Sequence, residues 1–172
     1  MVNILKLSLL FILISSFASA QQTTFQDSLL NRFVGSWVLQ GSIAETETTH
    51  DITAQWVLGH QYLQFHEISR EKNANDEAVY EAIVHIGWDK PAGRYACLWL
   101  DVTGGGGLSA EGIGHGQRNG DTIAFVFAGS DGSLFHTTFV YHRSADVWEW
   151  RMDGEVNGKL EPFARVKLTK KI

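Results

Sequence analysis

The sequence predicts an all-β fold: an up-and-down antiparallel β-barrel of about ten strands, closed at one end by a short N-terminal helix. Turn-forming stretches such as "RNGD", "SDG" and "NG" recur along the chain. The segments between them are about 8 to 12 residues long, as in barrels and sandwiches. Within these segments apolar and polar residues alternate, which is typical of a sheet with one buried face. The 17 glycines and 2 prolines also favour many turns and few kinks.

The first element in order is a secretory signal peptide over residues 1–20. A single charge at Lys6, an apolar run and the small residues Ala18 and Ala20 have the layout of a cleavable signal. The apolar run is shorter than the roughly 20 residues that a membrane span needs. We therefore expect a secreted or periplasmic protein without a membrane span, whose residues 21–172 form a single β-barrel domain.

Charge and cysteine content limit the classes of partner and chemistry. Loss of Lys6 with the signal changes the formal net charge from −5 to −6, and no basic stripe is present, so we expect no nucleic-acid partner. Cys97 is the only cysteine and excludes an internal disulfide. Its apolar neighbours in "YACLWL" predict a small buried hydrophobe, because nothing nearby would activate a thiol.

The next element is the predicted helix "FQDSLLNRF", residues 25–33. Leu29, Leu30 and Phe33 would share its apolar side. A short amphipathic helix just before the first strand is suited to cover the open bottom of a barrel.

Three residues are expected to complete this closure. Gly35 would let the backbone turn from helix into strand, and Trp37 would fill the base of the barrel. The last strand, "PFARVKLTKK", should return beside the first. Arg165 could then lie across the Trp37 indole as a cation–π contact.

In four of the predicted strands, alternation indicates which side chains share the buried face. Tight hairpins between neighbours favour the up-and-down order, and closure removes exposed sheet edges. A two-sheet sandwich is the alternative. The residues expected on the buried face are His50, Ile52, Ala54 and Trp56; Tyr95, Cys97, Trp99 and Asp101; Ile123, Phe125 and Phe127; and Trp148, Trp150 and Met152.

A Gly-x-Trp on the first strand and a basic residue on the last resemble the calycins, the superfamily of lipocalins and fatty-acid-binding proteins. A fuller resemblance runs from about Phe33 to Leu168 and rests on "GSW", "WVLGHQYLQ", "IGWDKPAGRY" and "LWLDVTGG". It is to an uncharacterised family of bacterial lipocalin-like barrels, a domain of unknown function. The resemblance implies a calycin-type barrel and no established activity.

The chain departs from two characterised groups of similar layout. The interval from Gly41 to Thr48 cannot hold the helical lid of fatty-acid-binding proteins, and Arg165 is not part of their Arg-x-Tyr clamp. The haem-binding nitrobindins use a late histidine, whereas the last histidine here is His142. We therefore expect neither haem nor another cofactor.

Metal and phosphate sites are not predicted. The seven histidines form no His-x-His or His-x-x-x-His pair. His50 and His136 are expected to point inward because each alternates with apolar residues. The glycine-rich "DVTGGGGLSAEG" lacks P-loop spacing and is expected to be a hairpin tip.

Aromatic content is the remaining unusual feature, with six tryptophans, ten phenylalanines and four tyrosines. A barrel of this size can enclose a cavity, and aromatic walls with a few polar groups are usual in small-molecule pockets. The first hypothesis is therefore an exported barrel that binds a small apolar or amphipathic molecule, with no catalytic residue assigned. The alternatives are an enzyme that uses Asp101 at the rim with a nearby histidine, and a structural or interaction barrel with a filled core. The expected ligand-binding residues are Trp99, Asp101, Phe125, Phe127, His136, Trp148 and Trp150.

Overall fold

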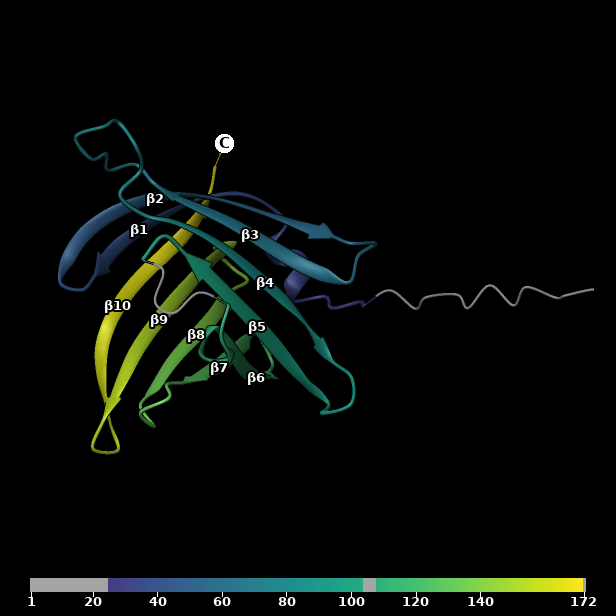
Figure 1. Cartoon of the computed structure of the whole chain (residues 1–172). Coiled ribbons are helices and arrows are strands. Elements are labelled where there is room, and N and C mark those ends of the chain that lie inside the picture. Colours follow the sequence, from purple (N-terminus) through teal and green to yellow (C-terminus); the bar gives the residue numbers. More distant parts are fainter. Residues whose placement is uncertain (1–24, 104–107, 172) are drawn as a thin grey trace, which may run out of the picture.

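The computed structural model describes residues 25–103 and 108–171, so the predicted signal peptide lies outside the described residues. Ten antiparallel strands close into a barrel in which each strand pairs with its sequence neighbours and β1 pairs with β10 (Figure 1). This confirms the expected all-β, up-and-down architecture, and the closure excludes a sandwich. The strands are β1 (Gly35–Ile43), β2 (Thr46–Val57), β3 (Tyr62–Ser69), β4 (Glu81–Asp89), β5 (Arg94–Asp101), β6 (Ile113–Asn119), β7 (Thr122–Ala128), β8 (Leu134–His142), β9 (Val147–Val156) and β10 (Lys159–Lys170).

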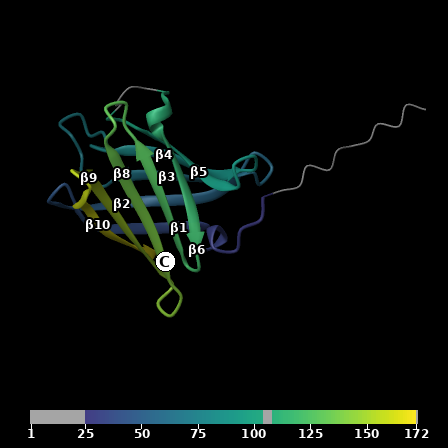
Figure 2. The ribbon, with the colours of Figure 1, turned by 90° about the horizontal axis from the view of Figure 1, so that it is seen from below.

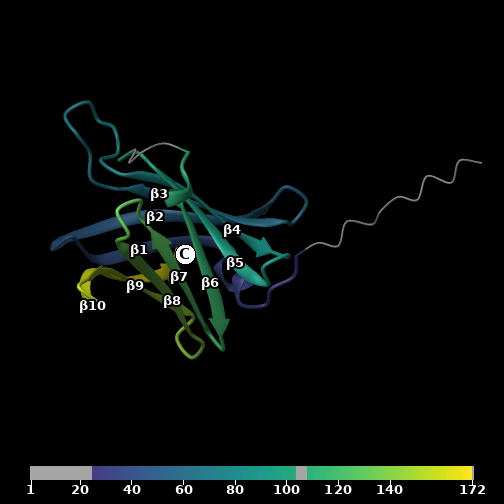
Figure 3. The same ribbon diagram turned by 60° about the horizontal axis from the view of Figure 1, so that its bottom comes forward.

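The up-and-down order gives the barrel two different ends. The connections after β1, β3, β5, β7 and β9 lie at one end, which we call the open end, and the other connections lie at the closed end. Figure 3 follows the strands around the barrel from β1 and β2 in blue to β9 and β10 in yellow. A short 3-10 helix, η2 (Ala110–Gly112), lies in the connection between β5 and β6. In the described part of the chain, no helix has the length and hydrophobicity needed to cross a membrane.

The N-terminal segment differs from the predicted helix over residues 25–33. Its helical part is a single 3-10 turn, η1 (Leu30–Phe33), which lies at the closed end of the barrel near the end of β6 (Figure 2). Asp27 accepts hydrogen bonds from the backbone N–H groups of Leu29 and Leu30 at 2.8 and 2.7 Å. Since β1 begins at Gly35, where φ is +129°, only one turn fits between this carboxylate and the strand.

Aromatic packing fills the closed half of the barrel. The Phe33 ring stacks on Trp148 with centroids 3.5 Å apart, and it meets the edges of Phe65 and Phe139. The Trp37 indole N–H donates to the Phe33 carbonyl at 2.5 Å. Leu29, Leu30 and Phe33 are buried, as the amphipathic pattern predicts. The turn therefore closes one end by inserting an aromatic ring into the barrel.

The expected contact between Trp37 and Arg165 is wrong. Trp37 pairs with Lys170, whose ammonium lies 5.4 Å from the indole centroid. Arg165 pairs with Ser42 instead and forms an ion pair with Asp153. The reason is both parity and register: the neighbours of Arg165 in β10, Ala164 and Val166, are buried, so the guanidinium faces outward, several residues from the closed end.

Candidate functional site

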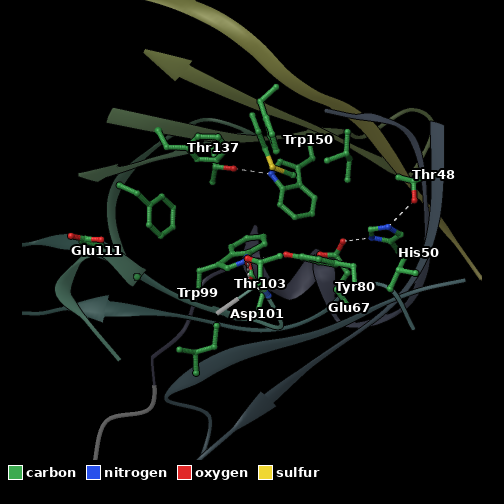
Figure 4. Close-up of a pocket in the computed structure, with 18 of the residues that line it drawn as sticks. Thr48, His50, Glu67, Tyr80, Trp99, Asp101, Thr103, Glu111, Thr137 and Trp150 are labelled. Carbon is green, nitrogen blue, oxygen red and sulfur yellow. Dashed lines mark hydrogen bonds and ion pairs between the residues drawn. The ribbon is translucent and has the colours of Figure 1, made fainter. Parts of the chain in front are cut away.

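A cavity of about 930 Å³ lies in the open half of the barrel (Figure 4). Its lining includes Ile43 and Thr46 at the open ends of β1 and β2, and Val79 and Leu108 from the open-end connections. Its volume is within the range of about 300–1,000 Å³ that is typical of small-molecule pockets. The interior is therefore filled at one end and hollow at the other.

Strand β9 marks the change from filled to hollow. Trp148, Trp150 and Met152 all point inward, because successive side chains of a strand alternate between its two faces. Trp148 packs on Phe33 in the closed half, whereas Trp150 and Met152 line the cavity. The hollow begins where the N-terminal turn no longer reaches.

A polar cluster around Asp101 forms one wall. Trp99 and Asp101 come from the inward face of β5, and Tyr80 comes from the segment just before β4. The Trp99 indole N–H lies 3.2 Å from both the Tyr80 hydroxyl and Asp101 Oδ2, and the Tyr80 hydroxyl lies 3.4 Å from Asp101 Oδ2. Thr103 donates its backbone N–H and its hydroxyl to Asp101 Oδ1, at 2.9 and 2.5 Å. Asp101 is thus held by four neutral donors.

The Tyr80 hydroxyl in this cluster remains a donor. Burial, together with the negative charges of Glu67 and Asp101, raises the pKa of Tyr80 far above its usual value. The phenol therefore keeps its proton and can donate it to Asp101.

A second polar cluster lies around His50 on β2. His50 Nδ1 is 2.5 Å from Glu67 Oε1 on β3, and His50 Nε2 is 2.8 Å from Thr48 Oγ1. The Thr48 hydroxyl also reaches Glu71 at 3.1 Å. The Tyr80 ring stacks on the imidazole with centroids 5.6 Å apart. The two polar clusters are therefore neighbours on the cavity wall, as Figure 4 shows.

The opposite wall is mainly apolar. The Trp150 indole N–H donates to Thr137 Oγ1 at 2.9 Å, which satisfies its polar atom. Trp150 and Trp99 approach across the cavity with ring centroids 5.4 Å apart. Phe127 and Phe135 from β7 and β8 extend this aromatic surface towards the mouth.

Of the seven residues predicted to bind ligand, four line the cavity: Trp99, Asp101, Phe127 and Trp150. Phe125 and Trp148 point inward as predicted but are fully buried, and neither is among the cavity-lining residues. His136 faces outward and pairs with Glu155 on β9 at 2.8 Å. Both faces of β8 carry apolar residues, so its alternation is ambiguous, and the larger rings of Phe139 and Tyr141 occupy the inside.

Sequence reasoning missed two of the polar cavity residues, Glu67 and Tyr80. Glu67 lies on the same face of β3 as the buried Leu63 and Phe65, so alternation along this strand could have revealed an inward carboxylate. Tyr80 lies outside any strand and gives no such signal. His50 was expected to point inward, and it does, with only 4% of its surface exposed.

The described residues form neither a cluster of metal ligands nor an activated cysteine. No group of three or more histidine, cysteine, aspartate or glutamate side chains is placed there to hold a metal. Cys97 is fully buried in β5, and burial raises the pKa of its thiol well above the usual value. Within the described chain, Asp101 has no histidine partner; the acid–histidine pair of the cavity is Glu67 with His50.

Comparison with known proteins assigns no family to this chain. No protein-family model matches the chain, and no curated protein matches it. The resemblance to calycin-type bacterial barrels stays a prediction.

Proposed function

We propose that this protein binds a small apolar or amphipathic molecule inside the open half of the barrel. The observation that carries the proposal is the cavity of about 930 Å³, which has an aromatic wall and two polar clusters. Apolar surface supplies most of the binding energy in such pockets, and a few fixed polar groups set the orientation of the ligand. A purely structural barrel would gain stability if side chains filled this volume.

Binding can be tested with the neutral fluorescent probe N-phenyl-1-naphthylamine. We expect its emission to rise on mixing and to be excited through Trp99 and Trp150, which line the cavity. Trp150→Ala should weaken binding. The matched control is Trp88→Ala, because Trp88 is 39% exposed and is not among the cavity-lining residues. A folded protein that takes up neither this probe nor other apolar probes would leave the structural barrel as the better explanation.

Export is part of this proposal and rests on the first 20 residues of the sequence, which have the layout of a cleavable signal. Expression in a bacterial host followed by fractionation should give a chain that begins at Gln21. A chain that retains residues 1–20 in the cytoplasm would exclude a role outside the cell.

A second candidate function, an enzyme, is favoured by one observation: the aligned Thr48, His50 and Glu67. Glu67 at Nδ1 would orient the imidazole, and Nε2, which now faces the Thr48 hydroxyl, could accept a proton from a bound molecule. Hydrolysis of p-nitrophenyl alkanoates by the wild type and by His50→Gln provides the test. Equal rates in the two proteins, with circular dichroism showing both folded, would remove this candidate.

A further inference from the structure

The charges that line the cavity are unbalanced. Among the lining residues that the structure describes, the acids are Glu67, Asp101 and Glu111, and there is no lysine or arginine. The one basic side chain is His50, which lies against Glu67. A protonated His50 is neutralised by Glu67, and a neutral His50 leaves Glu67 negative. In either state the cavity carries net negative charge.

Asp101 is the carboxylate of interest because it combines exposure to the cavity with the lack of a counter-ion. Its four hydrogen-bond donors, from Tyr80, Trp99 and Thr103, are all neutral. No lysine, arginine or histidine in the described chain lies within ion-pair distance of it. These hydrogen bonds satisfy the carboxylate oxygens, but they bring no positive charge to Asp101.

Carboxylates on the outside of the barrel have a different environment. Five of them form ion pairs with arginine, and one of the five also has a lysine partner; they are Asp51 with Arg70 and Lys171, Asp89 with Arg94, Asp121 with Arg143, Glu149 with Arg151, and Asp153 with Arg165. Cations are therefore available in this protein and are placed beside exterior acids. Among the described residues, Asp101 in the cavity has no such partner.

Aromatic faces near Asp101 would also attract positive charge. Trp99 lies beside the carboxylate, Trp150 faces it from the opposite wall, and Tyr80 completes the cluster (Figure 4). The face of an aromatic ring is electron-rich and attracts an ammonium group, most strongly for tryptophan. The Asp101 carboxylate and the aromatic rings thus both favour a positively charged ligand group.

We propose that the ligand is a cationic amphiphile: a protonated amine attached to an apolar chain or ring system. This inference rests on the proposed binding function and names its ligand class. The ammonium would lie at Asp101, and the apolar part would lie along Trp150, Phe127 and Phe135. A fatty acid with an apolar chain of the same length as the amine would bring a further negative charge to the cavity, whose described lining has no arginine or lysine to pair with it.

The test compares decylamine, decanol and decanoate, used below their micelle concentrations, as competitors of bound N-phenyl-1-naphthylamine at pH 7. The three share one chain and differ in head-group charge. We expect decylamine to displace the probe at concentrations at least about tenfold lower than decanoate, with decanol between them, since a hydrogen bond between an ammonium and a carboxylate is worth about tenfold in affinity. Equal displacement, or a preference for decanoate, overturns the inference.

Asp101→Asn identifies the responsible carboxylate. Its amide oxygen can still accept from Thr103, and we expect the preference for decylamine over decanol to disappear. Glu155→Gln is the control, because it removes one charge from the outer face of β9, where Glu155 pairs with His136. Loss of the preference in both variants, or its retention in Asp101→Asn, contradicts the assignment. The wild-type ranking decides the ligand class even if a variant does not fold.

The failures of the two proposals can be told apart. If the neutral probe binds but the amine has no advantage, the cavity is a binding site and only the ligand class is wrong. If the folded protein binds neither this probe nor other apolar probes, the binding function itself is excluded.

Discussion

Two tryptophans on β9 should respond very differently to truncation. Trp148 and Trp150 lie two residues apart and point into the same barrel. Trp148 has no measurable exposure and stacks on Phe33 with centroids 3.5 Å apart. Trp150 forms part of the cavity wall. Substituting each tryptophan by alanine therefore compares the effect of truncation in the filled half of the barrel with its effect in the hollow half.

The expected costs follow from these surroundings. A buried indole removes about 150–250 Å² from water, which is worth about 4–6 kcal/mol at about 25 cal/mol per Å². The Trp148 indole N–H has no hydrogen-bond partner among the described residues, so Trp148→Ala loses packing and leaves a dry void, at a cost of about 4 kcal/mol. The space left by Trp150→Ala joins the existing cavity, where water can enter. We expect that variant to cost about 2 kcal/mol, including the lost bond to Thr137.

Urea unfolding followed by far-UV circular dichroism would measure both free energies, and probe binding would measure the effect on the cavity. Trp150→Ala should lose more affinity than stability, and Trp148→Ala should do the reverse. Trp148→Phe serves as a milder variant if the alanine protein does not fold. Equal destabilisation, or a larger binding defect from Trp148→Ala in folded protein, would refute the division into a filled and a hollow half.

Three further predictions concern the barrel itself. Gly41→Ala should cost at least about 2 kcal/mol, because φ is +144° there and a Cβ would collide with the Arg165 carbonyl oxygen; Gly154→Ala, where a Cβ meets nothing within 4 Å, should change stability by less than about 0.5 kcal/mol. Burial acts to raise the pKa of Asp27, but hydrogen bonds from Tyr95 and the backbone, with the charge of Arg118, hold it below the usual 3.8. The contribution of ionised Asp27 to the free energy of unfolding is therefore present above pH 3.8 and is lost as the pH falls through the lowered pKa. In urea unfolding, Asp27→Asn should cost about 1–2 kcal/mol at pH 7 and progressively less in acid; a constant cost down to low pH would argue against this role. Cys97 should react with Ellman's reagent only after unfolding in guanidinium, since burial raises the pKa of its thiol; rapid reaction of the native protein would contradict its burial.

Sequence alone determined the order of the strands and the direction of most side chains. Hairpin turns join neighbouring strands, and alternation within a strand is a local property of the extended backbone. For these reasons the residue pattern is enough to assign Trp99, Asp101 and Trp150 to the interior of a barrel. Where both faces of a strand are apolar, as around His136, the same reasoning fails because hydrophobicity no longer distinguishes inside from outside.

Tertiary structure decided depth, register and long-range partners. Trp148 and Trp150 have the same orientation, and only the position of Phe33 makes one a core residue and the other a cavity residue. The pairing of β1 with β10 places Lys170 beside Trp37, a register that involves residues more than a hundred positions apart. The ion pair of His50 with Glu67 likewise requires two strands to align, and Tyr80 reaches Asp101 from outside any strand. Such contacts depend on how the whole sheet closes, because no local pattern specifies which residues meet across it.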